Sequence, residues 1–351
     1  MGAVLGFSLQ RVFTKREIRM KAVGYKAPGA PDILQDIELP DPAPPQGRDL
    51  LVRVKAVSIN PVDTKIRQRA GALEGDDWRV LGWDAAGIVE AVGPDVSHFR
   101  PGDRVFYAGA LMRQGSNAEK QLVEETLVGH MPEGLDWGQA ASLPLTAVTA
   151  WEMLFDRLSV THLTSGALLV VGGAGGVGSI LIQIARKLTG LTIIATASRP
   201  ETREWVERMG AHHVIDHRGD MAAQIRALGL EHVSHIASLT ASDQHQKTYE
   251  EILAPQGHLS LIDDPAHFDI MGFKRKSAVI SWEFMFTRSL FATPDKARQH
   301  DILEQVSSLV QAGDLVPTEL RRVTGLSAET LMALHRDSEA GTSIGKTVLV
   351  F

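Results

Sequence analysis

The sequence predicts an α/β protein of two domains, one built on a doubly wound parallel sheet and the other rich in β-strands. Strand and helix patterns alternate from about Thr146 to Trp282, and such alternation gives a parallel sheet covered by helices. Short strand patterns separated by turns fill the stretch from Met20 to about Leu145, which is typical of a small barrel-like domain. The length of 351 residues also fits two domains.

The composition excludes several classes of function. The net charge of −6 and the isoelectric point near 6.1 argue against a nucleic-acid or membrane-surface partner. The chain has no cysteine, which excludes disulfides, thiol catalysis and cysteine-ligated metals. No apolar run approaches the length of a membrane span. We therefore expect a cytoplasmic protein that binds neither nucleic acid nor membrane.

Residues 1–19 form an extension ahead of the predicted fold. Four basic residues outnumber the one acid, Glu17, which resembles a weak transit peptide, and the short apolar start is compatible with a signal sequence. We prefer an extension that comes from cloning or from a misassigned start, because Met20 opens the strand-like stretch MKAVGY. The fold prediction therefore leaves residues 1–19 out.

The β-rich domain is predicted from strand patterns bounded by turns, and residues 20–145 and 290–351 are assigned to it. The strands are Asp49–Ile59, Ala85–Val92, Arg104–Tyr107 and a closing Lys346–Phe351 that returns after a helix at Asp301–Ala312.

Residues 146–289 are assigned to the parallel-sheet domain. The predicted strands are Ala167–Val171, Leu191–Ala197, His213–Asp216, His232–Leu239, Gly257–Asp263 and Ala278–Trp282. The predicted helices are Ser179–Leu188, Glu201–Met209, Asp220–Leu228 and Gln244–Leu253.

A glycine motif joins the first of these strands to the first of these helices. The motif is G-x-G-x-x-G, formed by Gly173, Ala174, Gly175, Gly176, Val177 and Gly178. In this setting it is typical of dinucleotide binding. Gly173 is expected to make the tight turn, Gly175 to let the backbone approach a pyrophosphate, and Gly178 to let the helix pack on the strand. The helix N-terminus would bind the phosphates. A glycine turn without a ligand is the alternative, which the strand–turn–helix context disfavours.

The end of the second strand bears on the choice of nucleotide. NAD-binding proteins place an acid there for the ribose 2′-hydroxyl, but this chain has Ser198 and Arg199. Arg199 can bind a 2′-phosphate bidentately, and Arg203 and His217 are further candidates. The alternative is that both arginines are solvated helix-start residues. The missing acid favours NADPH over NADH.

Several stretches resemble the medium-chain dehydrogenase/reductase superfamily, and most closely its quinone oxidoreductase-like branch. The resemblance implies a GroES-like catalytic domain, a Rossmann domain, an active-site cleft between them and, usually, a dimer or tetramer; we expect a homodimer. The stretches, apart from the glycine loop, are Val54–Lys65, Leu81–Pro94, Val96–Val105, Ala140–Trp151 and Gly345–Val350.

Zinc is not expected. Zinc-using relatives place a cysteine after the strand that ends here at Ile59 and a histidine–glutamate pair at the stretch Gly82–Asp84, where this chain has Asn60 and Trp83. The lobe that holds a second zinc in those relatives is missing after Asp103. Zinc needs thiolate, imidazole or carboxylate ligands, so we predict no metal.

Without a metal to activate an alcohol, the resemblance points to hydride transfer from NADPH to a quinone or an α,β-unsaturated carbonyl. Asn60 is the candidate donor to the acceptor oxygen, or it caps a strand-end turn. Asp63 orients its neighbours or is structural. Lys65 stands where such quinone reductases commonly have a tyrosine; it could supply a proton or a positive charge, or be solvated.

Two further residues resemble family members near the cofactor. Thr149 resembles a threonine beside the nicotinamide, and otherwise would be the N-cap of a helix beginning at Ala150. Lys346 resembles a lysine near the cofactor, and otherwise is a charge at the start of a strand.

An aromatic segment follows the last strand of the parallel sheet. It would lie in the core or a dimer interface, or would line an apolar acceptor pocket, and the two roles can coexist. Its residues are Trp282, Phe284, Phe286 and Phe291.

The sequence thus predicts a zinc-independent, NADPH-dependent quinone or enone reductase. A zinc-type alcohol dehydrogenase, an enoyl-thioester reductase and a non-catalytic nucleotide-binding protein acting as a sensor, structural protein or RNA-binding partner are the alternatives.

Overall fold

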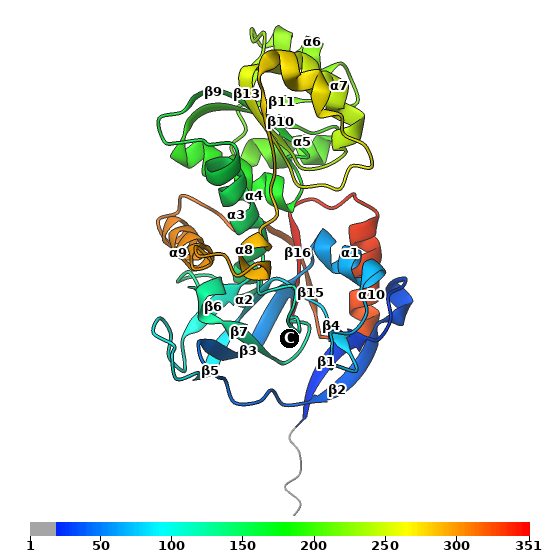
Figure 1. Cartoon of the computed structure of the whole chain (residues 1–351), viewed down its shortest axis with the longest axis vertical. Helices are drawn as coiled ribbons and strands as arrows, with labels where there is room; N and C mark the ends of the chain where they lie inside the picture. Colours follow the sequence, from blue (N-terminus) through cyan, green and yellow to red (C-terminus); the bar gives the residue numbers. More distant parts are fainter. Residues whose placement is uncertain (1–18) are drawn as a thin grey trace, which may run out of the picture.

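The computed structural model describes residues 19–351, which form two domains stacked along the long axis of the molecule (Figure 1). The segment coloured green to yellow makes the upper domain. The lower domain is made by the blue and cyan segment together with the orange and red C-terminal segment. The chain therefore enters the upper domain once and returns to the lower one. No helix in the described part of the chain is long and apolar enough to cross a membrane.

The upper domain is a six-stranded parallel sheet with the strand order β11-β10-β9-β12-β13-β14. This is the order of a doubly wound nucleotide-binding sheet, so the predicted fold class is confirmed. The strands are β9 (Ser165–Val171), β10 (Gly190–Thr196), β11 (His213–Ile215), β12 (Val233–Ser238), β13 (Leu253–Leu261) and β14 (Val279–Trp282). The fifth strand begins earlier than predicted because Leu253 already pairs with Val233, ahead of a register shift in β12.

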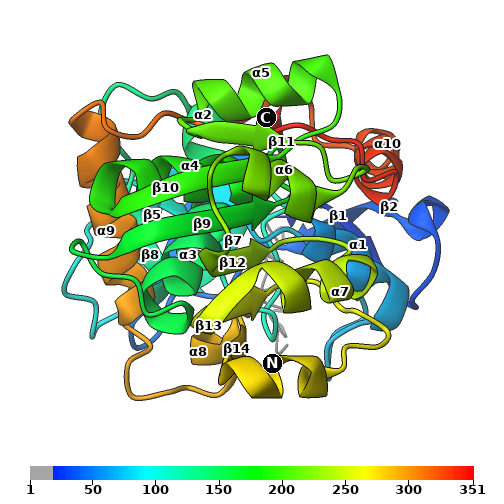
Figure 2. The ribbon, with the colours of Figure 1, turned by 90° about the horizontal axis from the view of Figure 1, so that it is seen from above.

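Helices cover both faces of this sheet (Figure 2). Leu168 and Val170 of β9 pack in one apolar cluster with α4 (Gly176–Leu188) and α5 (Pro200–Arg208). The alternate residues of the same strand pack in a second cluster with α6 (Met221–Ala227) and α7 (Ser242–Ile252). Burial on both faces explains why the strands read as continuous apolar runs.

The lower domain contains a seven-stranded sheet and a three-stranded sheet. Strand β16 pairs with β3, so the C-terminal strand closes the domain that the N-terminal part begins. The seven strands are β3 (Asp49–Ser58), β5 (Ala85–Val92), β6 (Arg104–Tyr107), β7 (Lys120–Glu124), β8 (Val128–His130), β15 (Glu319–Thr324) and β16 (Lys346–Val350). The three are β1 (Arg19–Tyr25), β2 (Gln35–Pro40) and β4 (Arg79–Val80).

The predicted N-terminal boundary needs a correction of one residue. Arg19 was placed in the extension, but it opens β1 and pairs with Pro40 of β2. Residues 1–18, and with them the proposals about a transit peptide or an added start, lie outside the described residues.

Helix α3 (Pro144–Trp151) connects the two domains, and a single apolar cluster includes residues of both domains around it. It continues into a π-helical turn at Glu152–Arg157. The idea that Thr149 caps a helix beginning at Ala150 is wrong. Pro144 stands at the first turn, as proline favours, and Thr149 lies inside the helix, where its Oγ1 donates to the carbonyl of Leu145 at 2.8 Å.

The remaining helices are α1 (Pro61–Arg69), α2 (Trp137–Ala141), α8 (Thr287–Leu290), α9 (Arg298–Gln311) and α10 (Ala328–Glu339).

Candidate active site

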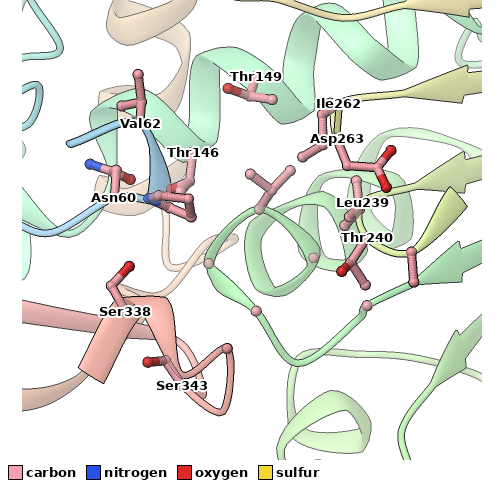
Figure 3. Close-up of a pocket in the computed structure, with 18 of the residues that line it drawn as sticks. Asn60, Val62, Thr146, Thr149, Leu239, Thr240, Ile262, Asp263, Ser338 and Ser343 are labelled. Carbon is pink, nitrogen blue, oxygen red and sulfur yellow. The ribbon is translucent and has the colours of Figure 1, made fainter. Parts of the chain in front are cut away.

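A cleft of about 1380 Å³ lies between the two domains. Figure 3 shows Asn60, Val62 and Thr146 on one side of it, facing Leu239, Thr240 and Ile262, which follow the carboxyl ends of β12 and β13. Most of the residues predicted from sequence line this cleft: Asn60, Lys65, Thr149, Ala174, Gly175, Gly176, Val177, Gly178, Ser198, Arg199, His217 and Lys346. Three predicted residues, Asp63, Gly173 and Arg203, are not among its lining residues.

The glycine loop has the predicted position, and its tight turn involves Gly172 as well as Gly173. Gly172 has φ +83°, a conformation that favours glycine, whereas Gly173 is not among the residues of positive φ. A Cβ at Gly173 would lie 3.0 Å from the Cβ of Ala195. Gly173 therefore allows β9, β10 and α5 to pack closely. Gly173 lies within the turn, as predicted, but the residue of positive φ in it is Gly172.

The other two glycines of the motif have the expected surroundings. A Cβ at Gly178 would lie 2.5 Å from the carbonyl oxygen of Gly173, so α4 can approach the end of β9 only with glycine there. Gly175 precedes the first residue of α4, and a Cβ there would meet only the carbonyl oxygen of Gly172, at 3.6 Å. The backbone at Gly175 is therefore open on the cleft side, in front of a helix N-terminus suited to anions.

Two arginines flank Ser198 at one end of the cleft. Arg199 donates from Nη2 to the carbonyl of Thr342 at 3.0 Å and pairs with Glu201. Arg218 also lines the cleft and donates to the carbonyl of Ser198 at 2.7 Å. The predicted Arg203 instead donates to backbone carbonyls at the ends of β10 and β11.

Sequence reasoning missed Arg218. Its partner Asp216 accepts hydrogen bonds from it, and these bonds lower the pKa of Asp216 to about 2. The topology of the predicted doubly wound sheet could have indicated Arg218. Because β11 lies parallel beside β10, the loop after β11, which contains His217 and Arg218, lies at the same edge of the sheet as Ser198.

On the lower-domain wall, Asn60 belongs to a buried polar network centred on Asp84. The Oδ2 atom of Asp84 accepts from Ser58 Oγ and from Asn60 Nδ2, both at 2.7 Å, and its Oδ1 accepts from the backbone of Leu145 at 2.7 Å. Lys346 lies 3.1 Å from Asp84 and donates to Asn60 Oδ1 at 2.5 Å. The ammonium of Lys346 is thus directed at Asn60 and Asp84.

Asp84 is a residue of the candidate site that sequence reasoning did not single out. The available signal was an acid in the apolar stretch LGWDAAGIV, because a buried carboxylate is retained only where charged or hydrogen-bonding partners surround it.

Asp63 lies behind this network, as the structural interpretation of it expects. Asn60 is the N-cap of α1 and Asp63 occupies the third position of the helix. The Asp63 carboxylate accepts from the backbone N–H of Asn60 at 2.7 Å and so fixes the turn that presents Asn60. Burial raises the pKa of Asp63 to about 7.

This raised pKa predicts a pH dependence of stability. The folded chain binds the Asp63 proton more tightly than the unfolded chain, so the contribution to stability is greatest below the usual value of 3.8 and is lost as the pH rises to about 7. Asp63→Asn is expected to reduce this fall. Urea unfolding at pH 4 to 8 measures it, with the exposed Asp32→Asn as control. An unchanged slope in Asp63→Asn would contradict the assignment.

Lys65 lies at the mouth of the cleft. Its Nζ is 3.3 Å from Asp264, and Arg69, one helical turn further along α1, reaches the same carboxylate at 3.2 Å. Asp264 follows β13 in the upper domain, so these pairs join the two domains across the mouth. Each is partly exposed, and such pairs contribute little to stability.

The aromatic segment divides between the cleft and the surface. Phe284 and Phe286 line the cleft, and Phe286 packs edge-on against Trp83 at 6.3 Å. Trp282 and Phe291 are exposed, with 51% and 72% of their surface accessible. The cleft role and a surface role therefore coexist in one segment.

The side chains at this site do not fit zinc. Trp83 turns its Nε1 to the carbonyl of Ala110. Of the two carboxylates beside Asn60, that of Asp84 is bonded to an ammonium and that of Asp63 accepts from the Asn60 backbone. A zinc ligand set needs several thiolate, imidazole or carboxylate groups. Among residues 19–351 no group of three or more such side chains could hold a metal ion.

Comparisons with known proteins match both domains. Residues 46–149 match the family model "Alcohol dehydrogenase GroES-like domain", and residues 176–295 match "Zinc-binding dehydrogenase". A zinc-type alcohol dehydrogenase-like protein of Staphylococcus aureus is 41% identical over 341 residues, covering 94% of this chain and 99% of its own.

Solved structures agree over almost the whole chain. One from Rhizobium etli, provisionally described as a zinc-dependent alcohol dehydrogenase, is 54% identical with a TM-score of 0.92, covering 95% of this chain and 98% of its own. The quinone oxidoreductase of Coxiella burnetii is 25% identical with a TM-score of 0.78, covering 95% and 100%.

Proposed function

The chain belongs to the medium-chain dehydrogenase/reductase superfamily, among the zinc-type alcohol dehydrogenase-like proteins, and from this premise we propose that it reduces a quinone or an α,β-unsaturated carbonyl with NADPH and without zinc. The observation that carries the proposal is the Asn60 amide on the cleft wall, held by Asp84 and Lys346 where zinc-using relatives have metal ligands. The amide can polarise an acceptor oxygen, but it cannot activate an alcohol as a metal does.

The cleft residues suggest how NADPH would be held. Its pyrophosphate would lie against Gly175 and the N-terminus of α4, where backbone N–H groups are free. Arg199 and Arg218 would take the 2′-phosphate beside Ser198. Thr149 would lie beside the nicotinamide. Bound there, the cofactor supplies a hydride.

The acceptor would enter from the mouth beside Lys65. Val62, Ile262 and Phe286 provide apolar walls that exclude water from the reacting atoms. Asn60 would donate from Nδ2 to the acceptor oxygen as negative charge develops on it. Lys65 is a side chain at the mouth that can supply the proton that completes the reduction. The Coxiella quinone oxidoreductase supports a quinone as the acceptor class.

An assay on metal-stripped protein tests this function. We expect NADPH to bind more tightly than NADH, and 1,4-benzoquinone or a simple enone to be reduced at a rate that EDTA leaves unchanged. Turnover that is lost with the chelator and restored by zinc would contradict the zinc-free proposal. NADPH binding without turnover on either acceptor would favour the non-catalytic alternative.

We also propose that the protein is a homodimer joined at β14. This strand is at the edge of the six-stranded sheet, where open backbone groups can pair with another strand. Val279 and Trp282 on it are 45% and 51% exposed. Sedimentation that gives the mass of a single chain at micromolar concentration would overturn this proposal.

A further inference from the structure

The carboxamide of Asn60 lies between two buried groups of opposite charge. Its Nδ2 donates to Asp84 at 2.7 Å, and its Oδ1 accepts from Lys346 at 2.5 Å. Asp84 is fully buried and Lys346 is only 3% exposed. Burying charges this deeply is costly unless they are paired and hydrogen-bonded. Even a paired buried ion pair adds little to stability, so a functional role for the pair has to be considered.

These two partners allow only one of the two orientations of the amide. An ammonium can only donate a hydrogen bond, and an ionised carboxylate can only accept one. Turning the amide by 180° would place its NH₂ group against Lys346 and its oxygen against Asp84, which replaces two attractive contacts by two repulsive ones. In a buried site such contacts are only weakly screened.

The fixed orientation leaves one donor of Asn60, which lines the cleft, with only a weak partner. Asn60 Nδ2 has a second hydrogen, whose nearest partner is the carbonyl of Ser58 at 3.4 Å, a long contact for a hydrogen bond. We infer that this weak contact is exchanged for the oxygen of a bound acceptor. In the flipped amide the same position would present Oδ1, which would repel a developing oxyanion.

Asp84 and Lys346 also connect Asn60 to the elements that would hold the cofactor. Asp84 bonds the backbone of Leu145 in the first turn of α3. The aliphatic part of Lys346 passes beside the glycine loop, since a Cβ added at Gly176 would lie 2.9 Å from the Lys346 Cδ. The ammonium also donates to the carbonyl of Ile59 at 2.7 Å.

We propose that Lys346 and Asp84 are positioning residues that hold the Asn60 amide with its NH₂ group toward the acceptor. Lys346 provides the resident cation of the site, held by the oxygens of Ile59, Asn60 and Asp84. The effect on turnover rests on the proposed reductase function, whereas the orientation of the amide can be tested without any turnover.

The sequence offers a direct readout, because Asn60 and Asn117 are its only two asparagines. Selective ¹⁵N-asparagine labelling would give two side-chain NH₂ signals in an NMR spectrum, and Asn60→Ser assigns them. In Lys346→Met we expect the Asn60 signals to shift and their hydrogens to exchange faster with solvent. The Asn117 signals, from a residue outside this network, are expected to stay in place.

Kinetics separates positioning from a general structural effect. In Lys346→Met we expect kcat to fall about tenfold to a hundredfold, the range for residues that orient a reacting group, with little change in NADPH affinity. Lys120→Met serves as the matched control, because Lys120 pairs with Asp41 away from the cleft lining. It is expected to have wild-type kcat.

A second variant covers the case in which Lys346→Met does not fold because Asp84 is left unpaired. The double variant Asp84→Leu/Lys346→Met replaces both charges by apolar side chains of similar size, which is often nearly neutral for stability, and it adds no third asparagine to the spectrum. We expect it to fold, to show altered Asn60 signals and to keep a low kcat.

Two results would overturn the proposal. Unchanged Asn60 signals in a folded variant would show that the pair does not orient the amide. Altered signals with wild-type kcat would show that the orientation does not serve the reaction. A wild-type protein that reduces neither acceptor would instead contradict the proposed function, and the NMR measurement would still decide the orientation.

Discussion

Alanine at Gly178 is expected to destabilise the upper domain and to abolish tight nucleotide binding, whereas alanine at Gly175 is expected to affect binding alone. A Cβ at Gly178 would lie 2.5 Å from the carbonyl oxygen of Gly173 and 2.6 Å from that of Gly172. Both are backbone atoms, so α4 or the loop must move. Overpacking of this kind costs about 1–3 kcal/mol or more.

Gly175 provides the matched comparison, since its backbone conformation is accessible to alanine and its Cβ would meet nothing closer than 3.6 Å. The new methyl group would occupy space that the pyrophosphate needs. Loss of one charge-assisted hydrogen bond costs about 1.5–3 kcal/mol, or about tenfold to a hundredfold in the dissociation constant of NADPH.

Thermal unfolding and NADPH fluorescence titration measure the two effects separately. Wild-type melting of Gly178→Ala would contradict the close approach of α4 to β9. Wild-type NADPH affinity in a folded Gly175→Ala would show that the loop is not the phosphate site.

The glycine loop also shows how far the sequence alone could lead. Its position between a strand and a helix followed from the pattern of apolar residues, and the six strands of the sheet were predicted with small shifts at their ends. The role of each glycine was harder to predict. A choice between Gly172 and Gly173 for the turn depends on φ and on the neighbours Ala195 and Val206, and neither is written in the local pattern.

The polar network at Asn60 could not be predicted from the sequence alone. Asn60 was predicted as a candidate from a family resemblance, but its partners Asp84 and Lys346 are 24 and 286 residues away in sequence. Only the pairing of β16 with β3 brings Lys346 to this wall.

The start of α3 could have been predicted from a local signal, because a proline after Leu143 is typical of a first helical turn.

Removal of the Arg199 side chain is expected to weaken NADPH binding strongly and to leave NADH binding nearly unchanged. Arg199 lines the cleft beside Ser198, at the strand end where NAD-binding proteins carry an acid for the 2′-hydroxyl. A bidentate arginine–phosphate contact is among the stronger hydrogen bonds in proteins. We expect Arg199→Ala to raise the dissociation constant of NADPH about tenfold to a hundredfold.

Arg218 is expected to carry part of the same contact, so Arg199→Ala/Arg218→Ala should lose more NADPH affinity than either single variant. Arg226→Ala is the control, because Arg226 forms an exposed pair with Glu251 outside the cleft lining. Equal losses for NADPH and NADH in Arg199→Ala would contradict a 2′-phosphate role. They would indicate that Arg199 acts through the carbonyl of Thr342, by holding the loop before β16 against the upper domain.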